Sequence, residues 1–102
     1  MSRLEQLKTM LAEEPADTFL RYGVAMEYAK AQQLPEALQE FAELLKRDPN
    51  YVAGYFMAGR TQEQAGDVAA AKQLYEQGVE AARRTGDTHA AAEIGDALAA
   101  LQ

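Results

Sequence analysis

The chain has 102 residues, with no Cys, three Pro and a net charge of −6. Its length predicts one domain, and its richness in Ala, Leu, Glu and Gln favours helix throughout. The negative charge disfavours nucleic acid as a partner, the lack of Cys excludes disulfides and thiolate metal sites, and no apolar run is long enough to span a membrane. No signal peptide is evident in "MSRLEQLKTM", so we expect a cytoplasmic, all-α protein.

The first helices in chain order are delimited by caps and prolines. Ser2 with Glu5 forms a capping box, which predicts a helix that ends before Pro15. Asp17 can cap the second helix. Pro35 suits the first position of the third helix, because its missing N–H would have no partner there in any case.

The later helices are delimited in the same way. The dipeptide Asp48-Pro49 ends the third helix, because Pro restricts the residue before it. Gly66-Asp67 and Gly86-Asp87 each read as a stop followed by a cap. Two pairs, Glu43–Arg47 and Glu80–Arg84, have the i,i+4 spacing and order that support a helix. Six helices joined by very short turns are therefore predicted.

The residues repeat with a period of 34, which is typical of a stacked helical array. Small residues recur with this spacing, and so do the large residues that would pack against them. The pairs are Pro15 and Pro49, Ala25 and Gly59, Ala37 and Ala71, and Phe41 and Tyr75; Leu7 and Phe41 extend the series towards the N-terminus. With two residues inserted, Gly95 continues the series of Ala25 and Gly59. We expect the small residues to let paired helices approach, and the large ones to fill the space between them.

This pattern resembles the tetratricopeptide repeat (TPR), W-x2-L-G-x2-Y followed by A-x3-F and P. The second repeat has Tyr55, Ala58, Gly59 and Gln62, then Ala71, Tyr75 and Gly78; the first has Arg21, Val24, Ala25 and Tyr28, then Ala37, Phe41, Leu44 and Pro49. Arg21, Gln62 and Arg83 depart from the pattern. The resemblance covers nearly the whole chain.

The resemblance implies a TPR-type solenoid of helical hairpins, with about six antiparallel helices in a short right-handed superhelix. The expected segments are an N-terminal packing helix in 1–15, repeat 1 in 18–51, repeat 2 in 52–85 and a closing helix in 86–102. Because one repeat cannot bury its own apolar face, neighbouring repeats must stack. The first helix of each repeat would line a concave face.

The helices of this chain carry more bulky apolar side chains than one buried face can hold. A helical wheel places the additional ones on that concave side. In TPR proteins this side resembles the groove that takes a peptide or a helix of a partner protein, and exposed apolar patches commonly mark such sites. The predicted groove residues are Phe19, Tyr22, Met26, Lys30, Phe56, Met57, Arg60, Glu63 and Gln64. The closing helix would add His89, Ala92, Glu93 and Asp96.

Two alternatives to a peptide-binding groove stay open at this point. The bulky residues could pack into the core, with Phe19 bracing the N-terminal helix. The same apolar strip, or the end of the array at Ala97 and Leu101, could instead form a homodimer. A clamp for a chaperone's C-terminal carboxylate, known in some TPR domains, is not expected, because its positions here carry Tyr22, Met26 and Met57.

No catalytic, metal or cofactor site is predicted. His89 shares a helix face with Glu93 and Asp96, but one imidazole with two carboxylates is typical of a solvated surface. Ser2 is explained as a cap, and there is no Cys or second His from which a nucleophile and base could be built. The scattered glycines form no phosphate-binding loop. We therefore expect a non-enzymatic module whose partner is another protein.

Overall fold

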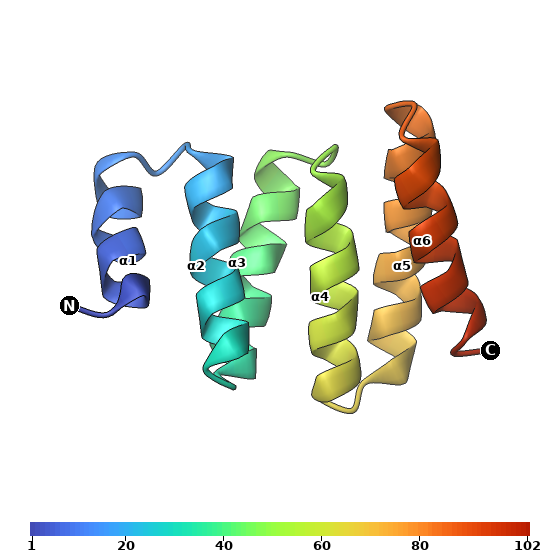
Figure 1. Cartoon of the computed structure of the whole chain (residues 1–102), viewed down its shortest axis with the longest axis horizontal. Helices are drawn as coiled ribbons and strands as arrows, with labels where there is room; N and C mark the ends of the chain where they lie inside the picture. Colours follow the sequence, from blue (N-terminus) through green and yellow to red (C-terminus); the bar gives the residue numbers. More distant parts are fainter.

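The structure, a computed structural model, describes all 102 residues and contains six α-helices and no strands. The helices stand side by side along the longest axis, with the two termini at opposite ends (Figure 1). None of them is long and apolar enough to cross a bilayer. Their bounds are α1 Arg3–Glu13, α2 Thr18–Lys30, α3 Leu34–Arg47, α4 Val52–Gln64, α5 Val68–Arg84 and α6 Thr88–Ala99.

The predicted caps are confirmed at four helix starts. Ser2 Oγ accepts a hydrogen bond from the backbone N–H of Glu5, 3.1 Å long. The carboxylates of Asp17, Asp67 and Asp87 each accept from the N–H three residues on, at 3.0 Å. Pro35 differs from the prediction by one position, because α3 begins at Leu34 and so places Pro35 second.

Three hairpin turns use a left-handed residue. Gly66 and Gly86 have φ values of 85° and 78°, where the missing Cβ removes the steric penalty. Gln32 has φ of 64° and stands 34 residues before Gly66, so the same turn is built in repeat 1 from a residue that pays that penalty. The sequence pattern did not indicate this conformation at Gln32.

The core consists of two clusters made by the repeating small and large residues. Ala25, Ala37 and Phe41 lie in the first cluster, and Ala71 and Tyr75 lie in the second. A Cβ added to Gly59 would lie 2.3 Å from a carbon of the Tyr75 ring. The ring thus lies directly against the α4 backbone, as the predicted close packing requires.

Gly95 does not share this close packing. A Cβ added there would meet nothing within 4 Å, although Gly95 occupies the position of Gly59 in the repeat pattern. The expected close approach is wrong at this position, because no helix packs against α6 in the way that α5 packs against α4.

The array is curved, with α2, α4 and α6 on its inner side. These three, the inner helices, come close to one another in succession, as α2 contacts α4 and α4 contacts α6. The helices α3 and α5 make no such contact, and an open cleft of about 240 Å³ lies between them. The inner helices therefore line the concave face.

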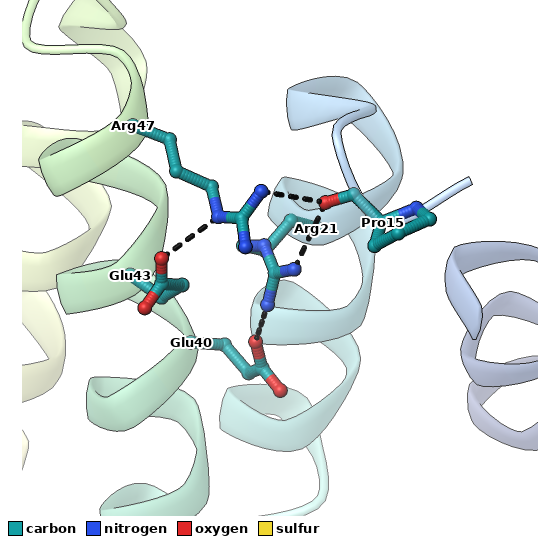
Figure 2. A network of polar contacts seen from close by, with 5 residues as sticks. All are labelled: Pro15, Arg21, Glu40, Glu43 and Arg47. Atoms are coloured by element: carbon teal, nitrogen blue, oxygen red, sulfur yellow. Dashed lines mark hydrogen bonds and ion pairs between the residues drawn. The ribbon is translucent and has the colours of Figure 1, made fainter. Parts of the chain in front are cut away.

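A proline carbonyl accepts hydrogen bonds at two turns, which we call the junctions: Pro15 in the turn between α1 and α2, and Pro49 in the turn between α3 and α4. Arg21 donates to the carbonyl oxygen of Pro15 (3.1 Å) and to Glu40 (2.7 Å), and Arg47 donates to the same carbonyl and to Glu43 (Figure 2). One repeat later, the Tyr55 hydroxyl donates to the carbonyl of Pro49 at 2.8 Å. Arg21 and Tyr55 are 34 residues apart, so the departure of Arg21 from the repeat pattern preserves this hydrogen bond with a different donor.

A charged side chain completes the second junction as well. Arg84 donates to the Pro49 carbonyl (3.1 Å) and to the Asn50 side chain (2.9 Å). The predicted pair between Glu80 and Arg84 is therefore wrong, because the guanidinium reaches across the junction instead. The pair between Glu43 and Arg47 does form, at 2.7 Å.

Candidate functional site

The nine predicted groove residues all lie on the inner helices α2 and α4. Their exposure differs widely: Phe19 is 73% exposed, whereas Tyr22, Met26, Phe56 and Met57 are half-buried. The polar members are all exposed: Lys30, Arg60, Glu63 and Gln64.

Five of these residues meet around one open hollow of about 460 Å³ between the C-terminal halves of α2 and α4. Its volume is within the range of ligand pockets. The lining, which we call the inner hollow, consists of the predicted Met26, Lys30, Met57, Arg60 and Gln64 together with Glu27, Ala29, Gln32 and Thr61.

The last four lining residues were missed in the sequence. Glu27 and Thr61 are themselves 34 residues apart, so the repeat spacing could have paired them. Thr61 is buried and donates its hydroxyl to the carbonyl of Met57, at 2.7 Å. It therefore stiffens the wall of the inner hollow and has its donor already occupied.

The aromatic members lie outside the inner hollow and are partly used by the core. The Tyr22 ring packs on Phe41 and Tyr51, with centroids 6.3 and 5.2 Å away, and burial raises the pKa of its hydroxyl. Phe56 packs on Tyr75, with centroids 6.1 Å apart. These two rings therefore pack on the core, as one interpretation of the sequence allowed. They also stay partly exposed, as the groove interpretation requires.

Phe19 stands apart from both the core and the inner hollow. It lies in the first turn of α2, with most of its ring in solvent. Other residues of α2 contact α1: an added Cβ at Gly23 would meet Leu7 at 3.4 Å, and Glu27 lies 3.6 Å from Arg3. The packing against α1 that was considered for Phe19 is therefore made by other residues of α2.

The cations of the inner hollow are unpaired, whereas the nearby carboxylates are engaged. Neither Lys30 nor Arg60 makes an ion pair, although the Arg60 guanidinium lies 5.9 Å from the centroid of the Phe56 ring. Glu27 lies 3.6 Å from Arg3 of α1. Glu63 accepts a hydrogen bond from the Tyr75 hydroxyl. Among the residues that line the inner hollow, the charges without an ion-pair partner are therefore positive.

The four residues expected from the closing helix are all exposed; Ala92 is apolar and the other three are polar. His89, Glu93 and Asp96 are all exposed on α6 and form no cluster of three that could hold a metal ion. Asp96 occupies the position of Arg60 one repeat later, yet no ion pair joins the two. At this position of the repeat the concave face thus carries a cation on α4 and a carboxylate on α6.

The most apolar hollow lies on the other side of the array. It is the cleft between α3 and α5, walled by Leu38, Leu45 and Leu74, with Ala58 of α4 at its floor. Its polar rim is formed by glutamines and carries no charge. The repeat pattern did not predict this cleft.

Stacked hairpins around a concave inner face define a helical-repeat protein of the kind that binds other proteins. A model of the tetratricopeptide repeat family matches residues 1–85, so the chain belongs to this family. The family and fold are generally non-catalytic interaction modules.

Known proteins agree with this assignment. A TPR repeat-containing protein of Pseudomonas aeruginosa is 34% identical over 91 residues, which cover 89% of this chain and 87% of that protein. The solution structure of a Bordetella parapertussis protein is 32% identical, with a TM-score of 0.85, covering 99% of this chain and 88% of that one. The crystal structure of PcrH in complex with the chaperone binding region of PopD has a TM-score of 0.90 at 19% identity, covering 96% of this chain and 74% of that one. At that identity the likeness shows the fold.

Proposed function

We propose that the protein is a non-catalytic module that binds a peptide or helix of a partner protein along its concave face, in the cytoplasm. The observation that carries the proposal is the inner hollow, where two half-buried methionines stand beside two unpaired cations. Methionine adapts to varied apolar ligands. The exposed Phe19 ring extends the apolar surface along α2.

The fold is compatible with such a partner. PcrH, which shares it, has been solved with the chaperone binding region of another protein, PopD. We propose by analogy that a segment of a partner protein, rather than a small molecule, occupies the concave face here. The predicted repeat segments 18–51 and 52–85 would each supply one inner helix to the site.

Homodimerisation is the second candidate, favoured by one observation on α6. Gly95 lies uncovered, whereas Gly59 at the equivalent position is covered by the Tyr75 ring. A helix of a second copy could pack there, beside the half-buried Leu98, which lines the same hollow as Gly95. Light scattering over a range of concentrations separates the two candidates, since a groove-binding module stays monomeric and an assembly module gains mass.

The test of the groove uses Phe56→Ala, with Val68→Ala as a matched loss of a half-exposed apolar side chain on α5. A random peptide library displayed on phage is selected on the wild type, and each enriched peptide is then titrated against both variants. We expect Phe56→Ala to weaken binding by about tenfold, as loss of an aromatic anchor commonly does, and Val68→Ala to leave it unchanged. Binding that is equal in all three proteins would place the ligand elsewhere.

A companion measurement separates binding from folding. Tyr55→Ala removes a buried ring and its hydrogen bond to Pro49, so we expect it to cost about 3 kcal/mol or more. Phe56→Ala should cost clearly less, because part of its ring faces solvent. Circular-dichroism melts give the comparison, and equal losses would show that Phe56 belongs to the core.

A further inference from the structure

The inner hollow carries a charge opposite to that of the molecule. The chain as a whole has a net charge of −6. Around this hollow, however, Lys30 and Arg60 are unpaired, while the only lining carboxylate, Glu27, lies beside Arg3. The remaining polar lining residues are neutral: Gln32, Thr61 and Gln64.

From this arrangement we propose that the inner hollow binds a partner segment in which a carboxylate side chain stands next to a large apolar side chain. The inference rests on the proposed groove function and names the chemistry of the ligand. The two cations would take the carboxylate, and the two methionines would take the apolar neighbour.

The cations are suited to a carboxylate by their type and their setting. Arg60 offers a planar fork of donors that matches the two carboxylate oxygens, and the Phe56 ring beneath it limits the directions in which it can point. Lys30 adds a second, more mobile positive charge from the last turn of α2. Glu63 does not line the inner hollow and forms no ion pair with either cation.

The apolar half of the ligand follows from the methionines. Met26 and Met57 are half-buried, so each already packs on the first core cluster while part of its side chain faces outwards. A large apolar side chain placed between them would cover that exposed part, which favours binding. Their flexible thioethers would accept Leu, Ile, Met or Phe at this position.

The experiment uses the same phage-displayed random peptide library, now selected in parallel on the wild type, Lys30→Gln, Arg60→Gln and Lys46→Gln. Lys46 is an exposed lysine of α3 that lies outside the inner hollow. Lys46→Gln therefore removes the same charge from the protein without changing the hollow. We expect Asp or Glu adjacent to Leu, Ile, Met or Phe to be enriched on the wild type and on Lys46→Gln. This enrichment should be lost on Lys30→Gln and Arg60→Gln.

One enriched peptide is then synthesised with an amidated C-terminus and measured by fluorescence anisotropy. Its Glu→Gln or Asp→Asn form should bind about tenfold more weakly, which is the usual loss when a charge-assisted hydrogen bond is removed. Affinity should also fall as salt is raised. Because Lys30 and Arg60 are exposed and unpaired, all variants should melt as the wild type does.

The outcomes distinguish this inference from the proposed function. Peptides that depend on Phe56 but contain no carboxylate, or that bind Arg60→Gln and Lys30→Gln as tightly as wild type, would overturn only the carboxylate assignment. Loss of binding on amidation would show that a C-terminal carboxylate is recognised, which also overturns it. If no peptide is enriched on the wild type, the groove function fails, and this inference fails with it.

Discussion

Gly59 and Gly95 occupy the same position of the repeat pattern in different surroundings, so one substitution should act on them with opposite sign. At Gly59, an added Cβ would lie 2.3 and 2.7 Å from two carbons of the Tyr75 ring, about 1 Å short of an ordinary contact. The ring cannot move away easily, because it is fully buried and its hydroxyl is held by Glu63. The helices α4 and α5 must therefore separate.

The magnitude follows from two opposing effects. Overpacking costs about 1–3 kcal/mol, and a contact as short as 2.3 Å to a held ring should cost about 2–3 kcal/mol of this range. Ala in place of a helical Gly offsets about 1 kcal/mol of that cost. We expect Gly59→Ala to destabilise the fold by about 1–2 kcal/mol, and Gly59→Leu by about 2 kcal/mol or more. Gly95→Ala has free space around it and keeps only the helix term, so it should stabilise by up to about 1 kcal/mol.

Thermal melts followed by circular dichroism measure both effects. For a domain of this size each kcal/mol shifts Tm by about 4–8 °C, so the two Ala variants should melt on opposite sides of the wild type. A Gly59→Ala protein that melts at or above the wild-type temperature would refute the close contact between α4 and Tyr75. A clear loss of stability in Gly95→Ala would show that α6 packs against something that the structure does not contain.

Two further predictions concern the ends of the array and the core tyrosine. Deleting residues 1–14 removes α1 with its buried Leu11, and should cause aggregation or loss of cooperative unfolding, measured by light scattering and urea titration; a monodisperse shortened chain with the same midpoint would contradict this. Burial first, and then the hydrogen bond to Glu63, raise the pKa of Tyr75 above the ordinary tyrosine value of about 10. The neutral hydroxyl therefore stabilises the fold fully below about pH 10. This stability is lost as the pH rises further, by up to about 1.4 kcal/mol per pH unit. Urea midpoints at rising pH should fall more steeply in the wild type than in Tyr75→Phe, and identical slopes would exclude Tyr75 as a cause.

The 34-residue spacing predicted the parts of the fold that depend on size and turn chemistry. The contact of Gly59 with Tyr75 follows from a small residue that recurs opposite a large one. The cap at Asp67 follows from an Asp placed directly after a Gly that ends a helix. The spacing could not predict Gln32 in a left-handed turn, because repeat 1 keeps the backbone of Gly66 with a residue that gives no such signal. The backbone geometry is shared by the two repeats even where the residue is not.

The candidate site was predictable as a face, but its internal division was not. The helical wheel placed Met26 and Phe56 on the same concave side, yet only Met26 lines the inner hollow, while Phe56 packs on Tyr75. A wheel gives the direction of a side chain from its own helix axis and omits what the neighbouring helix places there. For the same reason the sequence predicted that Arg84 would pair with Glu80, whereas it bonds to Pro49 and Asn50.

The two proline carbonyls each accept from two side chains and differ in one of them: Pro15 accepts from two arginines, whereas Pro49 accepts from Arg84 and from the Tyr55 hydroxyl. Arg21 remains a donor to Pro15 at any pH at which the protein folds. Tyr55, which donates to Pro49, stops being a donor once its hydroxyl ionises, although burial raises its pKa. In alkali the Pro49 carbonyl should therefore keep only Arg84 as a donor, whereas the Pro15 carbonyl keeps both Arg21 and Arg47. Two structurally equivalent turns thus differ in how many of their hydrogen bonds survive at high pH.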